Sequence, residues 1–139
     1  MTRVADIMTR SVATVQRDET IQAAAARMRE MDVGSLPVLD GKALAGMVTD
    51  RDITVRGVAE GMIPQESRVA DVMTDDLRWC RADDSVEQVM AEMGDAQVRR
   101  LPVLDGNDEF VGIVALGDIA TRQSEHTDET LREISTPTR

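Results

Sequence analysis

The sequence has almost no aromatic residues and only one cysteine. Aromatic side chains make up 1% of the 139 residues, so the core must be built from aliphatic residues and the nine methionines. The lone cysteine, Cys80, cannot form a disulfide within the chain, which fits a reducing compartment. No apolar run approaches the roughly 18 residues that span a bilayer, and the first residues do not resemble a signal peptide. We therefore expect a cytoplasmic protein with no membrane partner.

Basic residues are fewer than acidic ones, and histidine is scarce. With 26 acidic and 16 basic residues the net charge is −10, a field that repels nucleic acid. We expect no nucleic-acid partner, and an anionic ligand would need a local set of donors such as a helix N-terminus. His126 is the only histidine, and no cluster of metal ligands is present in the sequence. Because no base, nucleophile and oxyanion site come together, we expect no catalytic residues, no metal site and no enzyme activity.

The clearest positive feature is an internal repeat. Three blocks recur in the same order: residues 4–9 as 69–74, residues 36–41 as 101–106, and residues 46–53 as 112–119. The spacing is constant through the first two blocks, and one inserted residue lengthens it for the third. Three ordered matches indicate a duplicated structural unit.

Each copy predicts the same order of elements: a short helical lead-in, a strand, a helix, a hairpin of two strands and a second helix. An N-cap with acidic first-turn residues is expected within Asp18-Glu19-Thr20 and Asp83-Asp84-Ser85, before apolar residues at helical spacing, and Asp-Gly dipeptides mark the hairpins. The closing helices are expected at roughly 51–59 and 117–122. A three-stranded sheet with helices on one face leaves its other face apolar. We therefore expect an α/β (α+β) fold in which two units pack sheet to sheet with pseudo-twofold symmetry.

The expected boundaries follow from the repeat. The first domain covers residues 1–61 and the second covers 69–123, joined by a polar linker at 62–68. Residues 124–139 form a polar C-terminal tail, where 127–134 is either a short amphipathic helix or disordered.

The repeated unit resembles the CBS (cystathionine β-synthase) domain, and the tandem resembles a CBS pair, or Bateman module, of the stand-alone bacterial kind. The resemblance covers residues 4–122. It rests on the Met-Thr openings at residues 8–9 and 73–74, the two Leu-Pro-Val strands, and the closing patterns at 46–53 and 112–119. It implies two clefts in which adenosine nucleotides bind, and pairs that are often dimeric.

Thr49 and Asp52 are the leading candidates for a binding site. Thr49 ends a predicted strand, and Asp52 lies in the first turn of the next helix, whose free N–H groups attract phosphate. A carboxylate can accept hydrogen bonds from both ribose hydroxyls. The resemblance assigns the aspartate to the ribose, and the threonine to the ribose or a phosphate. The alternative is that Thr49 or Asp50 caps the helix and Asp52 only favours its dipole; for Asp52 we expect binding.

The second copy departs from this pattern. Ala115 replaces the hydroxyl residue and Gly117 replaces the arginine, while Asp118 keeps a ribose acceptor. The second site is therefore expected to be weaker, empty, or selective for a ligand with less phosphate.

Five further residues are weaker candidates. Arg51, Arg99 and Arg100 are placed to neutralise phosphates, although solvated surface arginines are equally consistent with the pattern. Val12 and Ala13, on the predicted first strand, would form an apolar wall for adenine, but ordinary core residues would look the same.

The leading functional hypothesis is a regulatory module that senses an adenosine-type nucleotide in the cleft between the repeats. AMP, ADP, ATP, S-adenosylmethionine and a dinucleotide all carry the ribose that Asp52 would bind, and no cofactor is required. The downstream protein partner is unknown. The alternative is a structural dimerisation or scaffold module with degenerate sites. An inosine monophosphate dehydrogenase, a third option, would need a barrel and a catalytic cysteine loop that are missing.

A homodimer is expected in either case. We expect the outer faces of the helices to leave apolar methionines for a partner copy, namely Met28, Met31, Met90 and Met93.

Overall fold

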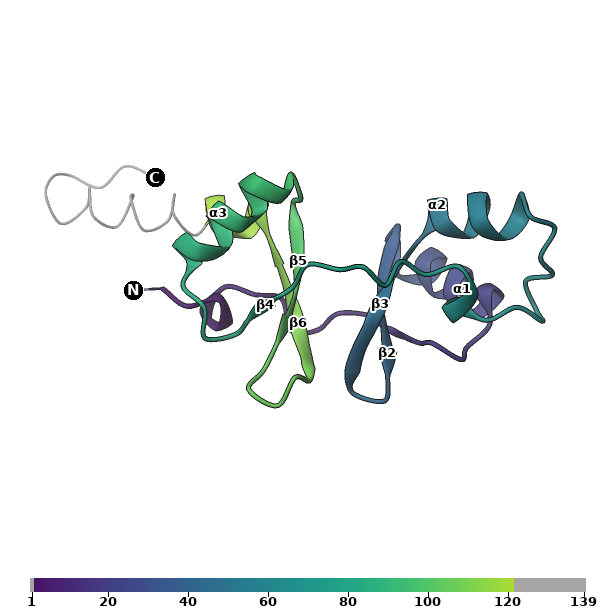
Figure 1. Cartoon of the computed structure of the whole chain (residues 1–139), viewed down its shortest axis with the longest axis horizontal. Helices are drawn as coiled ribbons and strands as arrows, with labels where there is room; N and C mark the ends of the chain where they lie inside the picture. The colour runs from purple at the N-terminus through teal and green to yellow at the C-terminus, as the bar shows by residue number, and fades with distance from the viewer. Residues whose placement is uncertain (1, 122–139) are drawn as a thin grey trace, which may run out of the picture. The chain divides into compact units, whose positions relative to one another are not determined.

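The computed structural model describes residues 2–121, which form two compact units (Figure 1). The Asp52 unit consists of Ser11–Arg78 and Asn107–Phe110. The Asp118 unit combines Met1–Arg10, Trp79–Gly106 and the chain from Val111 onward. Each unit contains one three-stranded sheet, ordered β1-β2-β3 in the first and β4-β5-β6 in the second. The mixed α/β fold expected from the repeat is therefore confirmed.

The Asp52 unit follows the predicted order of elements. In chain order these are β1 (Val15–Gln16), α1 (Ile21–Met31), β2 (Ser35–Asp40), β3 (Ala43–Thr49), α2 (Asp50–Asp52), the π-helix η2 (Ile53–Val58) and the 3₁₀ turn η3 (Val69–Asp71). Strand β1 runs parallel to β2, and β2 pairs antiparallel with β3. Helix α2 continues directly into η2, so the expected closing helix is present, with a wider last part.

The Asp118 unit repeats this order. Its elements are η1 (Val4–Asp6), β4 (Cys80–Arg81), α3 (Val86–Ala96), β5 (Arg100–Leu104) and β6 (Phe110–Ala115), followed by helical residues 116–121. Strand β4 is parallel to β5, as β1 is to β2. The predicted C-terminal tail lies outside the described residues.

The long helices begin at the predicted capping segments, with Thr20 and Ser85 as the N-caps, although the first turn of α1 holds no acidic residue. The hydroxyl of Thr20 accepts a hydrogen bond from the Ala23 N–H at 3.1 Å, and that of Ser85 accepts one from the Gln88 N–H at 3.2 Å. The Gln88 side chain in turn accepts from the Ser85 N–H at 3.0 Å, which completes a capping box. The helix starts were therefore readable from local chemistry.

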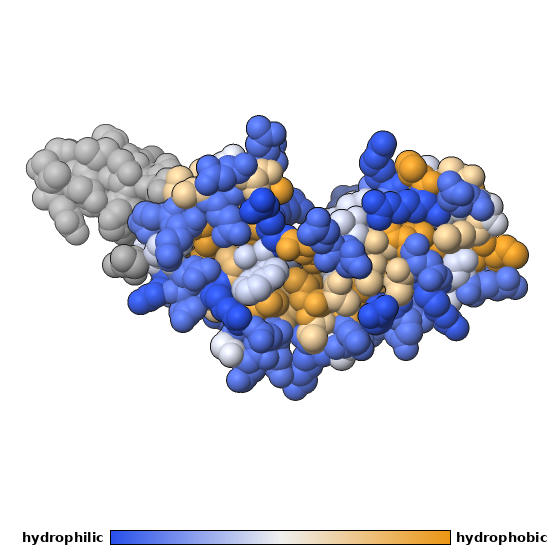
Figure 2. Space-filling view, viewed as in Figure 1, coloured by the Kyte–Doolittle hydropathy of each residue, from blue (hydrophilic) through white to orange (hydrophobic). Residues whose placement is uncertain are grey.

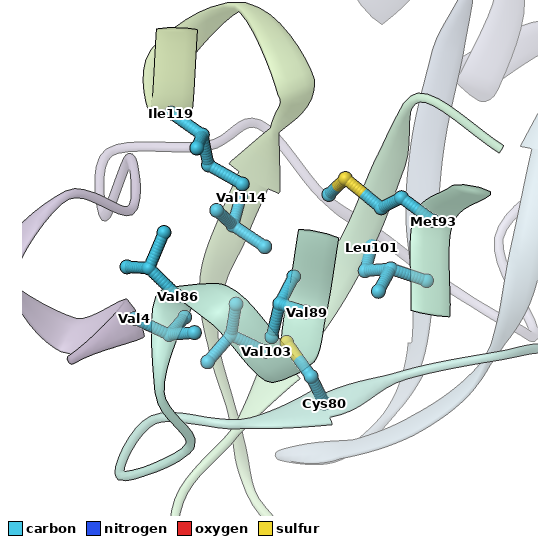
Figure 3. Close-up of a cluster of buried hydrophobic side chains, with 9 residues drawn as sticks. All are labelled: Val4, Cys80, Val86, Val89, Met93, Leu101, Val103, Val114 and Ile119. Carbon is cyan, nitrogen blue, oxygen red and sulfur yellow. The ribbon is translucent and has the colours of Figure 1, made fainter. Parts of the chain in front are cut away.

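A small aliphatic core lies between the sheet and the helices of each unit. In the Asp118 unit nine buried side chains from η1, β4, α3, β5, β6 and the final helix point toward one another (Figure 3). In the Asp52 unit the corresponding cluster joins β1, α1, β2, β3 and η3. Val69 and Val72 belong to this second cluster and Val4 to the first, all three with no exposed surface. Each core thus contains valines from the lead-in of the other copy, where the lead-ins are the repeated segments at residues 4–9 and 69–74.

Backbone hydrogen bonds hold each lead-in on the other copy. The Val4 N–H donates to the Asp84 carbonyl at 3.0 Å, and the Val69 N–H donates to the Glu19 carbonyl at 2.9 Å. These are equivalent positions of the repeat. The compact units therefore do not follow the linear repeats, and the domain boundaries expected from the sequence stay a prediction.

Two glycines permit this exchange. A Cβ on Gly46 of β3 would lie 2.6 Å from the Thr74 carbonyl oxygen, and one on Gly112 of β6 would lie 2.6 Å from that of Thr9. At both places the lead-in pairs with the strand through backbone hydrogen bonds, including Thr74 N–H to the Met47 carbonyl at 2.8 Å. Only glycine leaves room for the two backbones to approach this closely.

The two hairpins differ at their tips. In the Asp52 unit Asp40 pairs with Ala43, so the loop is the two residues Gly41-Lys42, and Gly41 has a φ of 66°. The Asp-Gly signal is confirmed there. In the Asp118 unit the residue with positive φ is Asp108, at 62°, rather than Gly106. The inserted residue lengthens this loop and moves the left-handed position away from the glycine.

The methionine faces expected to carry a dimer are only partly exposed. Met28 and Met93 are 6% and 2% exposed and belong to the two cores, so the prediction is wrong for both. Met90 packs against the core, whereas Met31 is 54% exposed. Met28 and Met93 lie on the helix faces that pack against the cores, and a buried face cannot also contact a partner. Apolar side chains nevertheless remain on the largely hydrophilic surface in Figure 2, and the homodimer stays a prediction.

Candidate functional site

Thr49 and Asp52 come together at the junction of β3 and α2. The Asp52 N–H donates to the Thr49 hydroxyl at 3.0 Å, and the Thr49 N–H donates to Oδ2 of Asp52 at 3.0 Å. This reciprocal pair is a capping box, which satisfies two backbone groups at the helix start. The capping role that the sequence offered as the alternative is therefore present. It uses one carboxylate oxygen and leaves the other, Oδ1, outside the box.

Arg56 lies next to that second oxygen. Its Nε is 4.0 Å from Oδ1 of Asp52, one helical turn away, and the Asp52 side chain is 14% exposed. Its Nη1 donates to the Met73 carbonyl at 3.2 Å, and to the Val72 carbonyl and the Thr74 hydroxyl at 3.4 Å each. The carboxylate of Asp52 thus has a cation beside it, and this cation also contacts the lead-in of the second copy.

Sequence reasoning missed Arg56 and Thr74 as parts of this site. Arg56 follows Asp52 by four residues, the spacing at which helical side chains meet, and Arg122 matches it in the second copy. That signal was available. The contact with Thr74 was not, because it depends on the chain returning to β3 after the linker.

The Asp118 unit keeps half of the same arrangement. The Ala115 N–H donates to Oδ2 of Asp118 at 3.3 Å, compared with 3.0 Å for the corresponding bond from Thr49. Ala115 has no hydroxyl that could accept a hydrogen bond from the Asp118 N–H. The departure predicted from the sequence therefore has a structural counterpart. Arg122, which matches Arg56, lies outside the described residues.

The remaining arginine candidates are exposed, and two of them belong to the other unit. Arg51 is exposed, and its backbone N–H donates to Asp50 at 2.8 Å. Arg99 and Arg100 are exposed and belong to the Asp118 unit, at and just before the start of β5. Their role toward phosphate stays a prediction.

Val12 and Ala13 were predicted to lie on the first strand, and this is wrong. Strand β1 contains only Val15 and Gln16, so both candidates precede it. They are half-buried, and Ala13 packs against the core of the Asp52 unit. The strand is short because only these two residues pair with β2. An adenine wall formed by the two residues stays a prediction.

Cys80 is a buried thiol with a raised pKa. It lies in β4 at 2% exposure, and burial, reinforced by the charges of Asp84 and Glu92, raises its pKa to about 12. The thiol is therefore protonated at neutral pH, the form that is a poor nucleophile. Within residues 2–121, no three His, Cys, Asp or Glu side chains are grouped so as to hold a metal ion. No helix in that range is long and apolar enough to cross a membrane.

The comparisons with known proteins agree on one family. The family model described as "CBS domain" matches residues 4–57 and 69–125. The CBS domain-containing protein YhcV of Bacillus subtilis is 45% identical over 88% of this chain and 86% of its own length. Hypoxic response protein 1 of Mycobacterium tuberculosis is 40% identical over 91% of this chain and 88% of its own.

Solved structures lead to the same family. Hypoxic Response Protein I, solved with two coordinated zinc ions, is 40% identical with a TM-score of 0.78, covering 88% of this chain and 99% of that one. The CBS domain pair of protein MJ0100, solved with 5′-methylthioadenosine and S-adenosyl-L-methionine, is 26% identical with a TM-score of 0.70, covering 86% and 98%. With two matched copies and relatives of similar length, the chain belongs to the CBS domain family and is a tandem CBS pair.

Proposed function

We propose that this CBS pair is a regulatory module that binds an adenosine-type nucleotide, with the carboxylate of Asp52 holding the ribose. The observation that carries the proposal is that the two oxygens of that carboxylate have different partners. Oδ2 accepts the Thr49 N–H at 3.0 Å, while Oδ1 faces only the Nε of Arg56 at 4.0 Å among its described contacts. A carboxylate oxygen has two lone pairs, so a hydroxyl can donate to Asp52 without breaking the helix cap.

The CBS pair of MJ0100 supports the ligand class. Its two ligands, 5′-methylthioadenosine and S-adenosyl-L-methionine, share an adenosine group and differ in the substituent on the ribose. An acceptor that binds the ribose diol recognises this shared part. We therefore propose adenosine compounds as the ligand class, with AMP, ADP, ATP and S-adenosylmethionine as the panel to test.

The exchange of lead-ins supports a regulatory role. Asp52 contacts Arg56, and Arg56 contacts residues 72–74 of the second copy. A ligand at Asp52 thus acts where the two copies are interleaved, and a differential affinity for two arrangements of this segment would shift their populations. A downstream protein would respond to that shift.

Asp52→Asn is the variant that separates binding from capping. The amide oxygen of asparagine can still accept the Thr49 N–H, but the side chain loses its charge and one acceptor. Ligands that bind the native state raise its melting temperature, by an amount equivalent to roughly 2.7 kcal/mol at 100 times the dissociation constant. We expect AMP or another panel member to raise the melting temperature of the wild type, and to raise that of Asp52→Asn much less.

Asp50→Asn is the matched control, because it changes an exposed carboxylate two residues away in the same helix. It should respond to ligand as the wild type does. An equal ligand response in Asp52→Asn and the wild type would remove Asp52 from the site, and no response to any panel member would remove the nucleotide.

A structural module with degenerate sites is the second candidate. Two observations favour it: the complete capping box already explains Thr49 and Asp52, and Ala115 removes the hydroxyl from the second site. In that case no ligand changes the melting temperature, and the chain self-associates with an unchanged constant in the presence of nucleotides.

A further inference from the structure

Arg56 connects the proposed ribose site to the segment that opens the second copy. Its guanidinium is 4.0 Å from Asp52 on one side, and on the other it donates to the carbonyls of Val72 and Met73 and to the hydroxyl of Thr74. The side chain is 53% exposed, so a ligand that reaches Asp52 also reaches Arg56. Among the described arginines it is the one that contacts the Asp52 carboxylate.

The hydrogen bonds that hold Arg56 are replaceable. All three acceptors are neutral, and the distances of 3.2 to 3.4 Å are long for hydrogen bonds of this type. Hydrogen bonds from a guanidinium to a phosphate, in which both partners are ionised, are shorter and often bidentate. An anionic group near Asp52 would therefore compete successfully with the two carbonyls for the guanidinium.

We propose that Arg56 selects a ligand with an anionic group beside its ribose, and that this group draws the guanidinium away from the carbonyls of Val72 and Met73. The inference rests on the proposed binding of ribose by Asp52 and specifies the class further: a nucleoside phosphate is preferred to the nucleoside. The segment would remain attached, because Thr74 and Met47 exchange two backbone hydrogen bonds at 2.8 and 2.9 Å. Ligand binding would loosen residues 72 and 73 without detaching the segment from β3.

Calorimetric titration with AMP and with adenosine tests the selection. The wild type should bind AMP more tightly than adenosine. Arg56→Met should lose about ten- to a hundredfold in AMP affinity, the range expected for a charged hydrogen bond, with adenosine affinity unchanged. Arg56→Lys keeps the charge and should keep part of the preference. Arg29→Met, which removes an exposed arginine from α1, should bind both ligands as the wild type does.

Amide hydrogen exchange tests the release of the segment. In the wild type, AMP should accelerate exchange at the Val72 and Met73 amides, which both donate to the Val69 carbonyl, and adenosine should not. Arg56→Met should show the faster exchange without ligand, and AMP should add nothing. A purely structural role for Arg56 would give a different result, since Arg56→Met would then weaken AMP and adenosine equally.

The outcomes separate the two proposals. If both ligands bind the wild type and Asp52→Asn weakens both, but the ratio of their affinities is the same in Arg56→Met, the role of Arg56 is overturned and the proposed function stands. Unchanged exchange at residues 72–73 on adding AMP overturns the release. If neither ligand binds the wild type, both proposals fail.

Discussion

At the scale of single residues, the two copies differ most at the helix cap. Thr49 and Asp52 form a complete capping box, whereas Ala115 gives Asp118 only half of one. A hydroxyl N-cap is worth about 1 kcal/mol over alanine. Ala115→Thr should therefore raise the free energy of unfolding by about 1 kcal/mol, and Thr49→Ala should lower it by a similar amount, both measured by urea denaturation. A loss in Thr49→Ala without a gain in Ala115→Thr would contradict the equivalence of the two positions.

A second residue pair makes stability depend on pH. The hydrogen bonds from Arg27 to Glu19, at 3.0 Å, lower the pKa of the Glu19 carboxyl below its usual value, partly opposed by desolvation. A lowered folded-state pKa stabilises the fold above the unfolded pKa of about 4.3, and this contribution is lost as the pH falls through the folded value. The pair is about one-third exposed, so its contribution is on the order of 0.5 kcal/mol.

Arg27→Met should accordingly be less stable than the wild type at pH 7, and the difference should shrink as the pH is lowered through the range below 4.3. Urea denaturation at a series of pH values measures it. Arg29→Met, on the exposed side of the same helix, should show no such convergence. A difference between Arg27→Met and the wild type that stays constant down to acid pH would mean that Glu19 is not responsible.

Residue-scale chemistry was the part that the sequence predicted best. The N-caps at Thr20 and Ser85 and the Asp40-Gly41 hairpin depend on neighbours a few residues away, so local patterns identify them. Arg56 needed one further step, its position one turn beyond Asp52. Its contacts with residues 72–74 could not be predicted, because they join positions separated by a linker.

At the scale of elements, the glycines of β3 and β6 decide how closely the lead-ins approach. A Cβ on Gly46 would lie 2.6 Å from the Thr74 carbonyl oxygen and 3.1 Å from the Met73 sulfur. Gly46→Ala should therefore lower the free energy of unfolding by about 1–3 kcal/mol, the usual cost of overpacking. Gly94→Ala, within α3 with no heavy atom within 4 Å of the added Cβ, should instead raise it by about 0.5–1 kcal/mol. Equal effects from the two substitutions in thermal or urea unfolding would contradict the close approach.

The types of the elements were predicted correctly, but the start of one strand and the exposure of two methionines were not. Val12 and Ala13 were assigned to a strand that begins at Val15, because alternation alone does not fix where pairing starts. Met28 and Met93 were assigned to outer helix faces, but both are buried. Burial depends on which element packs on the helix, and this is a long-range property.

At the scale of the whole molecule, the lead-ins make each compact unit a product of both copies. The core of the Asp52 unit requires Val69 and Val72, yet all of its core residues lie within Ser11–Arg78. A fragment of residues 11–78 should therefore unfold cooperatively, whereas a fragment of residues 1–64, which follows the linear repeat, should not. Circular dichroism during urea denaturation distinguishes them. Cooperative unfolding of the 1–64 fragment alone would show that the exchanged lead-in is dispensable.

The sequence repeat predicted two similar units but not this exchange. The two lead-ins are similar in sequence, so the sequence does not tell which copy each of them packs against. The hydrogen bonds from Val4 to Asp84 and from Val69 to Glu19 decide between the two. The same interleaving brings Arg56 and Asp52 next to the second lead-in, which is why the proposed site and the proposed response to ligand involve the same few residues.

The central claim is that the carboxylate of Asp52 binds a ribose diol while it caps its helix. The most direct measurement is a calorimetric cycle of wild type and Asp52→Asn against AMP and 2′-deoxy-AMP. The wild type should bind 2′-deoxy-AMP more weakly than AMP, by about tenfold for one lost hydrogen bond to a charged group. Asp52→Asn should bind both equally weakly. If the wild type does not distinguish the two ligands, or if Asp52→Asn distinguishes them as strongly as the wild type does, the carboxylate does not hold the diol.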